Sequence, residues 1–128
     1  MNKYDLRERT YRFAVNVVRF LSGSTSLPIT YPIFNQLIRS ATSIGANVEE
    51  ADSSPTRKDF KHKIVISKKE AAETVYWFRL VLDSGIIKTE DNINRARELL
   101  NEAEQLLKIL GSIISKLSEN DSEKEAVE

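Results

Sequence analysis

The chain of 128 residues contains no cysteine and only one histidine, His62. The absence of cysteine excludes disulfide bonds, thiolate metal sites and a cysteine nucleophile. A single histidine also excludes, within one chain, the pair of Glu-x-x-His motifs that di-metal helical bundles require. We therefore expect no metal ion and no cofactor.

Long apolar runs are missing as well. No run approaches the roughly 20 residues of a membrane-spanning helix, and the N-terminal sequence MNKYDLRE lacks the apolar core of a signal peptide. These absences predict a cytoplasmic protein that does not associate with membranes.

Net charge is zero overall, but the charges are unevenly distributed. Residues 1–69 hold 12 Lys and Arg against 6 Asp and Glu, whereas residues 90–128 hold 5 against 10. Binding of an anion responds to the local field rather than to the total charge. A neutral total is therefore compatible with an anionic partner.

Apolar residues recur at helical spacing in four stretches, separated by short breaks rich in Gly, Pro, Ser and Thr. The predicted helices span about 5–22, 30–52, 56–84 and 89–118. Short connections between amphipathic helices predict an all-α fold, an up-down-up-down antiparallel four-helix bundle formed by residues 1–119. Residues 120–128 are polar and show no apolar stripe, which predicts a disordered tail.

Residues at the breaks predict where the helices begin and end. Thr30 is a candidate N-cap of the second helix, either Ser54 or Thr56 can cap the third, and the fourth opens at Thr89. Pro32 fits the first turn of a helix, where a missing N–H costs nothing. Gly85 fits the left-handed position that follows a helix.

The last predicted helix carries an uninterrupted heptad seam. Its positions are Ile93, Ala96, Leu100, Ala103, Leu107, Leu110, Ile114 and Leu117. A second apolar stripe at steps of seven contains Leu99, Leu106 and Ile113. A helix in a bundle needs one flanking position beside the seam, so the second stripe alone does not establish self-association.

The second predicted helix has an unusual polar face. Ser40, Ser43, Asn47 and Glu50 recur at steps of three and four beside Arg39, whereas a solvated face usually carries Lys, Glu and Gln. Small residues such as Gly45 and Ala46 allow another backbone to approach. We expect this polar stripe to be hydrogen-bonded between packed helices.

The third predicted helix contains three consecutive rings, Tyr76, Trp77 and Phe78, which fan over about 200°. One inward face cannot bury all three, so at least one ring is expected to meet a second surface. The alternative is a Tyr and a Trp that lie half-exposed at a groove. The residues predicted to hold an assembly together are Arg39, Ser40, Ser43, Asn47, Glu50, Glu70, Glu73 and Trp77.

The third helix also begins with a basic run, which is the candidate nucleic-acid-binding surface. Its members are Arg57, Lys58, Lys61, His62, Lys68 and Lys69. Copies of this run in an oligomer would multiply the phosphate contacts. The plainer interpretation is a solvated helix face, and no aromatic residue between these cations offers a platform for base stacking.

Several of these motifs resemble one family. They are Arg39-Ser40-x-x-Ser43-Ile44-Gly45-Ala46-Asn47-x-x-Glu50-Ala51, Asp59-Phe60-x-His62-Lys63 and Lys69-Glu70-Ala71-x-Glu73-Thr74-x-Tyr76-Trp77. The chain resembles, over about residues 4–117, the bacterial four-helix-bundle proteins of ribosomal RNA intervening sequences, also called the S23 ribosomal protein family. The resemblance implies a cytoplasmic homo-oligomer, a pentameric ring, without enzymatic activity. A related branch, the accessory proteins of diversity-generating retroelements, binds nucleic acid and a reverse transcriptase.

Enzymatic alternatives have little support in the residues. An enzymatic interpretation would gather the carboxylates of Glu49, Glu50, Glu70 and Glu73 into one site, but pairing with Arg39 and the polar stripe explains them better. His62 lies among lysines, away from any recognisable Ser-His-Asp arrangement. The sequence therefore predicts a non-enzymatic RNA- or ribosome-associated accessory protein, with an oligomeric protein-interaction scaffold that binds no nucleic acid as the alternative.

Overall fold

The computed structural model describes residues 3–23 and 28–127, and every regular element in these residues is helical. The elements are α1 (Lys3–Gly23), a 3-10 turn η1 (Pro28–Thr30), α2 (Tyr31–Asp52), α3 (Arg57–Ser84) and α4 (Glu90–Val127). This confirms the prediction of an all-α chain with four helices. Residues 24–27, in the predicted break after the first helix, lie outside the described residues.

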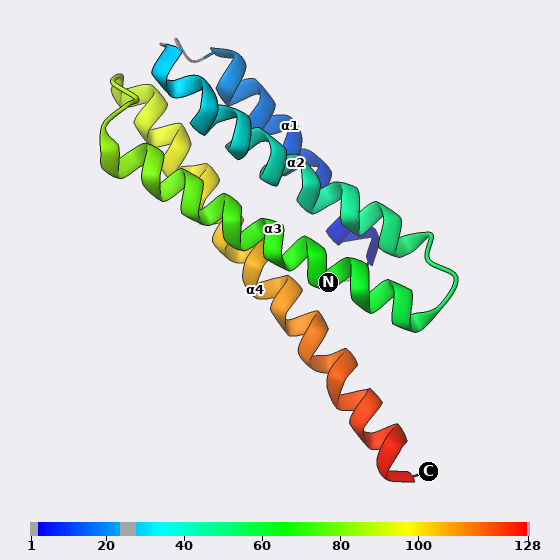
Figure 1. The fold of residues 1–128 in the computed structure, drawn as a ribbon. Coiled ribbons are helices and arrows are strands. Elements are labelled where there is room, and N and C mark those ends of the chain that lie inside the picture. Colours follow the sequence, from blue (N-terminus) through cyan, green and yellow to red (C-terminus); the bar gives the residue numbers. More distant parts are fainter. Residues whose placement is uncertain (1–2, 24–27, 128) are drawn as a thin grey trace.

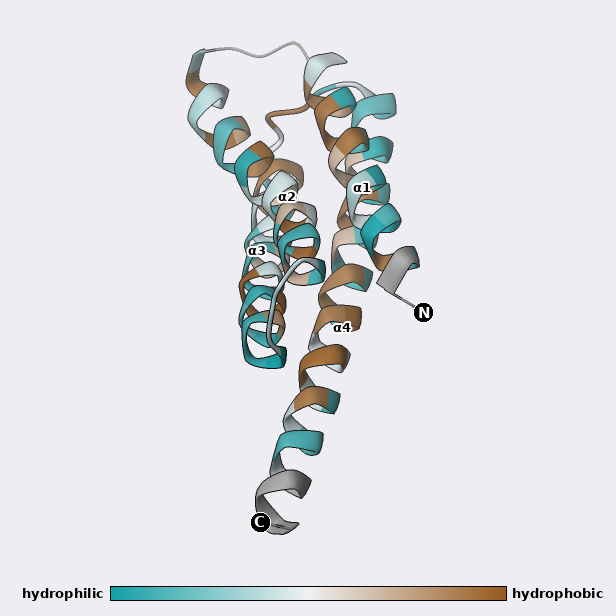
Figure 2. Cartoon of the chain, turned by 90° about the vertical axis from the view of Figure 1, so that its right-hand side faces the viewer, coloured by the Kyte–Doolittle hydropathy of each residue, from teal (hydrophilic) through white to brown (hydrophobic). Residues whose placement is uncertain are grey.

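Each helix packs against the next one in the chain, and α4 also contacts α1. Figure 1 shows that the chain reverses direction at each connection, so neighbouring helices run antiparallel. The packing of α2 on α3 is the most extensive, and that of α1 on α4 is the sparsest. Figures 1 and 2 show α4 continuing well past the other helices toward the C-terminus.

The predicted apolar stripes of α1 and α2 form the core. On α1 the buried residues are Leu6, Thr10, Phe13, Val17 and Phe20, and on α2 they include Leu37, Ala41, Ile44, Val48 and Ala51. Steps of three and four place these side chains on one face of each helix. From α3, Ile64, Ala71 and Phe78 complete the centre, and the Phe78 ring lies 6.3 Å from that of Phe20.

The buried line of α4 differs from the predicted seam. Its deeply buried residues are Ala96, Leu99, Ala103, Leu106 and Leu110. Leu100, Leu107 and Ile114, which the heptad pattern placed in the seam, are only half-buried. The reason is that α4 packs against α3 on one flank and α1 on the other, so the centre of the buried arc lies between the two predicted stripes.

Three predicted helix ends are confirmed. The Thr56 hydroxyl accepts a hydrogen bond from the Asp59 amide at 3.1 Å, and the Thr89 hydroxyl accepts one from the Asn92 amide at 3.1 Å. Gly85 has φ 72°, the left-handed conformation that glycine adopts without strain. Thr30 occupies the N-cap position of α2, but its side chain makes no capping bond, because its backbone is already helical within η1.

The α4 helix continues beyond the predicted boundary at residue 118, through Val127. The stretch predicted to be a disordered tail is thus helical, except for residue 128, which lies outside the described residues. Asp121 forms ion pairs with Arg57 and Lys61 of α3, which tie the extra turns to the bundle. The sequence pattern missed this because an ion pair across helices leaves no apolar stripe.

Candidate functional site

The polar stripe of α2 follows the seam between α2 and α3. Ser40 is fully buried, donates a hydrogen bond to the Leu37 carbonyl at 3.2 Å, and lies 2.9 Å from the hydroxyl of Thr74 on α3. Thr74 is also buried, with its hydroxyl 2.8 Å from the Glu70 carbonyl. The two hydroxyls satisfy one another inside the core.

A second buried hydroxyl joins the same helices. Ser67 of α3 donates a hydrogen bond of 2.8 Å to the Ile44 carbonyl of α2. On the opposite side of α2, Gly45 faces the backbone of Thr10 in α1, and a Cβ built on Gly45 would lie 3.3 Å from the Thr10 carbonyl carbon and oxygen. The prediction that small residues in this helix permit a close backbone approach is confirmed for Gly45.

Ser43 and Asn47 have a different environment from Ser40. Both are half-buried, and both bond within their own helix: the Ser43 hydroxyl donates to the Arg39 carbonyl at 2.6 Å, and the Asn47 amide donates to the Ser43 carbonyl at 2.8 Å. Of the predicted stripe, therefore, only Ser40 is sealed between helices within one chain. Ser43 sits farther around α2 than Ser40, because a step of three residues falls about 60° short of a full turn.

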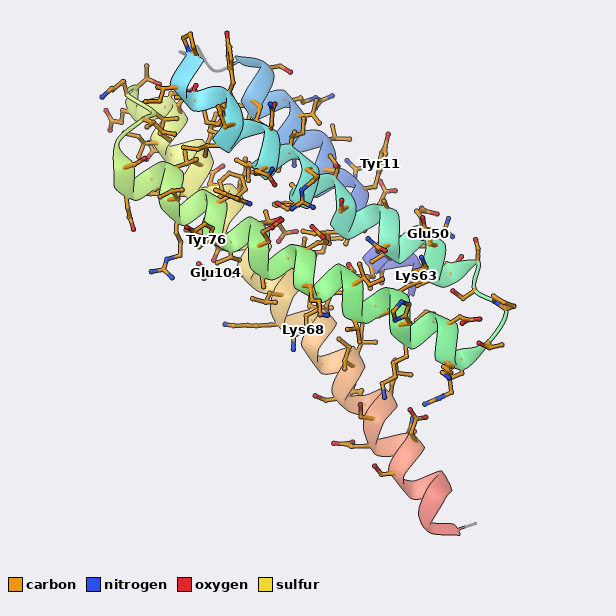
Figure 3. The ribbon with its side chains drawn as sticks, in the orientation of Figure 1. Tyr11, Glu50, Lys63, Lys68, Tyr76 and Glu104 are labelled. Carbon is orange, nitrogen blue, oxygen red and sulfur yellow. The ribbon has the colours of Figure 1, made fainter. Side chains whose placement is uncertain are left out.

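Ion pairs border the α2–α3 seam. Arg39 bonds Glu70 at 3.1 Å and also bonds Glu73 and Gln36. Lys63 pairs with Glu50 at 2.6 Å, and Figure 3 shows these two side chains between α3 and α2. The pairs are partly exposed to solvent, so each contributes about 0.2–1 kcal/mol and is screened by salt.

The three consecutive rings of α3 have three different environments, so one inward face does not bury them all. Phe78 is buried, Trp77 is half-buried, and Tyr76 is 59% exposed. The Trp77 ring meets that of Tyr76 edge-on with centroids 5.1 Å apart. Its indole Nε1 is buried and has no hydrogen-bond partner among the described residues, although such groups normally find one.

The basic run at the start of α3 divides between two faces. Arg57 and Lys61 turn toward α4, where each bonds a carboxylate oxygen of Asp121 at 3.2 Å. Lys68, also exposed, lies near Gly111 of α4 and is labelled in Figure 3. The remaining members of the run, Lys58, His62 and Lys69, are exposed. Helical spacing places these three together on the outer side of α3.

Three cations of the run form no ion pair within the described part of the chain. They are Lys58, Lys68 and Lys69. The other lysine of this segment, Lys63, is paired with Glu50. The surface available to an anion is therefore smaller than the sequence predicted.

Two arginines of α1, Arg7 and Arg9, connect this helix to its neighbours. Arg7 pairs with Glu49 at 2.7 Å and Asp52 at 2.9 Å, both on α2. Arg9 pairs with Glu102 of α4 at 2.6 Å, and this hydrogen bond raises the pKa of Arg9 against the opposing effect of burial. These contacts hold α1 to both neighbouring helices.

Sequence reasoning missed two residues of these sites, Thr74 and Asp121. Thr74 lies between the buried residues Ala71 and Phe78, three residues after the first and four before the second, so its position on the buried stripe was readable from the helical repeat. Asp121 follows Leu117 by four residues, so its position on the inner face of α4 was readable from the helical repeat. Because Asp121 is charged and lies among other polar residues, the sequence pattern assigned it to a solvent-exposed tail.

A groove of about 490 Å³ lies between α1 and α4, lined by Arg9, Glu102, Phe13, Leu99 and other residues. Its charged walls are engaged in ion pairs, including Arg9–Glu102 and Arg12–Glu8. Among the residues that the structure describes, no group of three or more His, Cys, Asp or Glu side chains is placed to hold a metal ion.

Comparison with known proteins identifies the family. The sequence model of the 23S rRNA-intervening sequence proteins matches residues 2–112. The chain belongs to this family. The match agrees with the resemblance inferred from the sequence motifs.

A solved structure supports the same family. It is a protein with unknown function from the S23 ribosomal protein family of Bacteroides thetaiotaomicron VPI-5482, with 34% sequence identity to this chain and a TM-score of 0.70. The match covers 85% of this chain and 97% of that one. No curated protein matches the chain. Across the described residues, no helix has the length and apolar content needed to cross a membrane.

Proposed function

We propose that this intervening-sequence family member is a non-enzymatic, RNA-associated accessory protein that binds RNA phosphates through the exposed basic face of α3. The family description points to ribosomal RNA. The observation that carries the proposal is a set of exposed lysines on α3 that form no ion pair with the described residues. Lys58 and Lys69 lie on the outer side of the helix, and Lys68 lies toward α4. Phosphate contacts dominate the affinity of proteins for nucleic acids. Its place of action is the cytoplasm, where ribosomal RNA is found.

We also propose that the protein acts as a ring-shaped homo-oligomer, a pentamer. Two features of the single chain support this. Tyr11 and Tyr76 are large rings left 63% and 59% exposed, and the Trp77 indole nitrogen lacks a partner among the described residues. Several copies would repeat the basic face of α3 and multiply its contacts with one RNA.

The RNA proposal is tested by fluorescence anisotropy with a labelled structured fragment of ribosomal RNA at low and high salt. The wild-type protein is expected to bind at low salt and to weaken as salt rises. The triple substitution Lys58→Glu, Lys68→Glu and Lys69→Glu should abolish binding, since it replaces three cations with three anions.

A matched control has the same change in charge at a distance from the start of α3. It replaces three exposed residues that form no ion pair in the described part of the chain, through Lys88→Glu, Arg97→Glu and Lys108→Glu. This control should retain most of the affinity. Equal loss in both triple variants would show that only net charge matters, and no binding by the wild type at low salt would remove the RNA proposal.

The second candidate is an oligomeric protein-interaction scaffold. The observation in its favour is the exposed apolar surface, which includes Tyr11, Val18 and Tyr31. Exposed aromatic residues of this kind are enriched at protein interfaces. An oligomer that binds no RNA at any salt concentration would favour the scaffold.

Multi-angle light scattering tests the assembly. A pentamer of 14.6 kDa chains has a mass of roughly 73 kDa. Trp77→Ala and Asn47→Leu, both at half-buried positions beside the α2–α3 seam, are expected to change this mass, whereas the exposed substitution Lys108→Ala should not. A wild-type protein that elutes at the mass of one chain would contradict the proposal.

A further inference from the structure

The C-terminal part of α4 lies beyond the family match. The match ends at residue 112, whereas α4 continues to Val127. We call residues 113–127 the overhang. The overhang carries four acidic residues against two lysines. The overhang is therefore an acidic addition next to the basic start of α3.

Asp121 sits at a position of α4 that faces α3. It follows the buried Leu110 by eleven residues and Leu117 by four, which keeps it on the inner face of the helix. A carboxylate stands where the seam would continue with an apolar residue. Opposite it, Arg57 and Lys61 are one helical turn apart, so both cations reach the same carboxylate.

The contact uses both oxygens of that carboxylate. Arg57 Nε lies 3.2 Å from Oδ1, and Lys61 Nζ lies 3.2 Å from Oδ2. The bond from Lys61, together with the bond from Arg57, lowers the pKa of Asp121 against a smaller opposing effect of burial. The carboxylate is thus ionised at neutral pH and neutralises cations that would otherwise be available to an anion.

The contact is also open enough to exchange. Side-chain exposure is 48% for Arg57, 31% for Lys61 and 39% for Asp121. Ion pairs at this exposure are weak and are screened by salt. A phosphate group carries the same charge-assisted hydrogen bonding as a carboxylate, and arginine binds it well.

We propose that the overhang is an autoinhibitory strap in which Asp121 occupies Arg57 and Lys61 and competes for them with the phosphates of RNA. The inference rests on the proposed RNA binding and adds its regulation. In the closed state, Lys58, Lys68 and Lys69 are the cations available for a first contact. When the strap is displaced, Arg57 and Lys61 extend the surface along α3 toward α4.

The test measures RNA affinity for Asp121→Asn over a range of salt concentrations. Freeing two cations should tighten binding by about three- to tenfold at low salt. It should also steepen the plot of log affinity against log salt by up to roughly 1.8, since each of the two added phosphate contacts contributes about 0.7–0.9. The control is Glu119→Gln, which removes one negative charge from the overhang at an exposed residue that forms no ion pair in the described residues. It should leave the slope unchanged.

A second set of variants distinguishes competition between Asp121 and RNA for the same cations from general repulsion between the acidic overhang and RNA. In the variant Arg57→Gln, Lys61→Gln the strap has no cations to cover, so adding Asp121→Asn should change neither the affinity nor the slope. Circular dichroism checks that each variant remains helical, and amide exchange in residues 113–127 of the wild type should accelerate when RNA is added.

The possible outcomes distinguish the two proposals. Tighter and steeper binding by Asp121→Asn than by the wild type, with no such gain for Glu119→Gln, supports the strap. If the wild type binds and Asp121→Asn binds identically, the strap is refuted while RNA binding stands. If neither protein binds at low salt, both proposals fail. Equal increases in RNA affinity for Asp121→Asn and Glu119→Gln would show that only the net charge of the overhang matters, and would also refute the strap.

Discussion

Two glycines inside helices show how differently one residue type behaves in this protein. Gly45 touches the backbone of Thr10, and a methyl group there would approach a carbonyl to 3.3 Å. Gly111 faces the flexible end of Lys68, where the nearest atom to an added methyl group is 3.7 Å away. Close approach explains the glycine at the first position, whereas nothing in the packing around Gly111 requires one.

The two glycines therefore predict opposite effects of alanine. Gly111→Ala should raise the free energy of unfolding by about 0.5–1 kcal/mol, because alanine favours the helix and meets only ordinary contacts. Gly45→Ala should lower it by about 1 kcal/mol, because the cost of overpacking against a backbone exceeds the helical gain. Urea denaturation measures both, and a stabilised Gly45→Ala protein would contradict the close-approach argument.

At the scale of single residues, the sequence identified the buried stripe of α2 and the role of Gly45, but it did not separate Ser40 from Ser43. Both are short hydroxyls in the same stripe, and only the angle at which α3 meets α2 decides that Ser40 is sealed. The pairing of Ser40 with the Thr74 hydroxyl was missed for the same reason. The angle at which two helices cross depends on both helices, and the residue pattern of one helix does not specify it.

At the scale of elements, α4 shows both the strength and the limit of periodicity. The heptad pattern identified a long helix with an apolar seam, but it chose Leu107 over Leu106. In the structure Leu106 is fully buried and Leu107 half-buried. A pattern in one helix fixes the width of its apolar arc, and the neighbouring helices fix the centre of that arc.

Alanine substitutions test this ordering. Leu106→Ala should lower the free energy of unfolding by about 2–5 kcal/mol, because it leaves a cavity in the core. Leu107→Ala should lower it by only about 1 kcal/mol, because the half-buried Leu107 side chain removes less apolar area from water when the protein folds. Thermal or urea unfolding of the two variants gives the comparison. Equal costs, or a larger cost at Leu107, would contradict the buried line described for α4.

The overhang of α4 should respond to acid through Asp121. The hydrogen bond from Lys61, with that from Arg57, lowers the pKa of this carboxyl below its ordinary value of 3.8. The ionised carboxylate of Asp121 therefore stabilises docking of the overhang fully above pH 3.8. This stabilisation is lost as the pH falls through the lowered pKa of Asp121 in the folded protein. NMR chemical shifts of residues 113–122 should report this step. Asp121→Asn should lack it, and a step centred above pH 5 would contradict the assignment.

At the scale of the whole molecule, composition and periodicity were sufficient for the all-helical class, the number of helices and most of their boundaries. They were insufficient for the surface that we propose binds RNA. The sequence grouped six residues from Arg57 to Lys69 as one basic run, whereas folding brings Asp121 against two of them, which lie 64 and 60 residues earlier in the chain. Charge pairing between distant segments becomes visible only once the helices are placed.

The order in which the helices pack also bears on how the chain reaches its native state. Almost all packing joins helices that are consecutive in the chain, and only the sparse α1–α4 seam connects distant segments, as in the pair Arg9 and Glu102, which are 93 residues apart. Chains dominated by such local contacts fold within roughly microseconds to milliseconds. The hairpin of α1 and α2, and then α3, can consolidate while α4 is still being synthesised, with docking of α4 against α1 as the closing event.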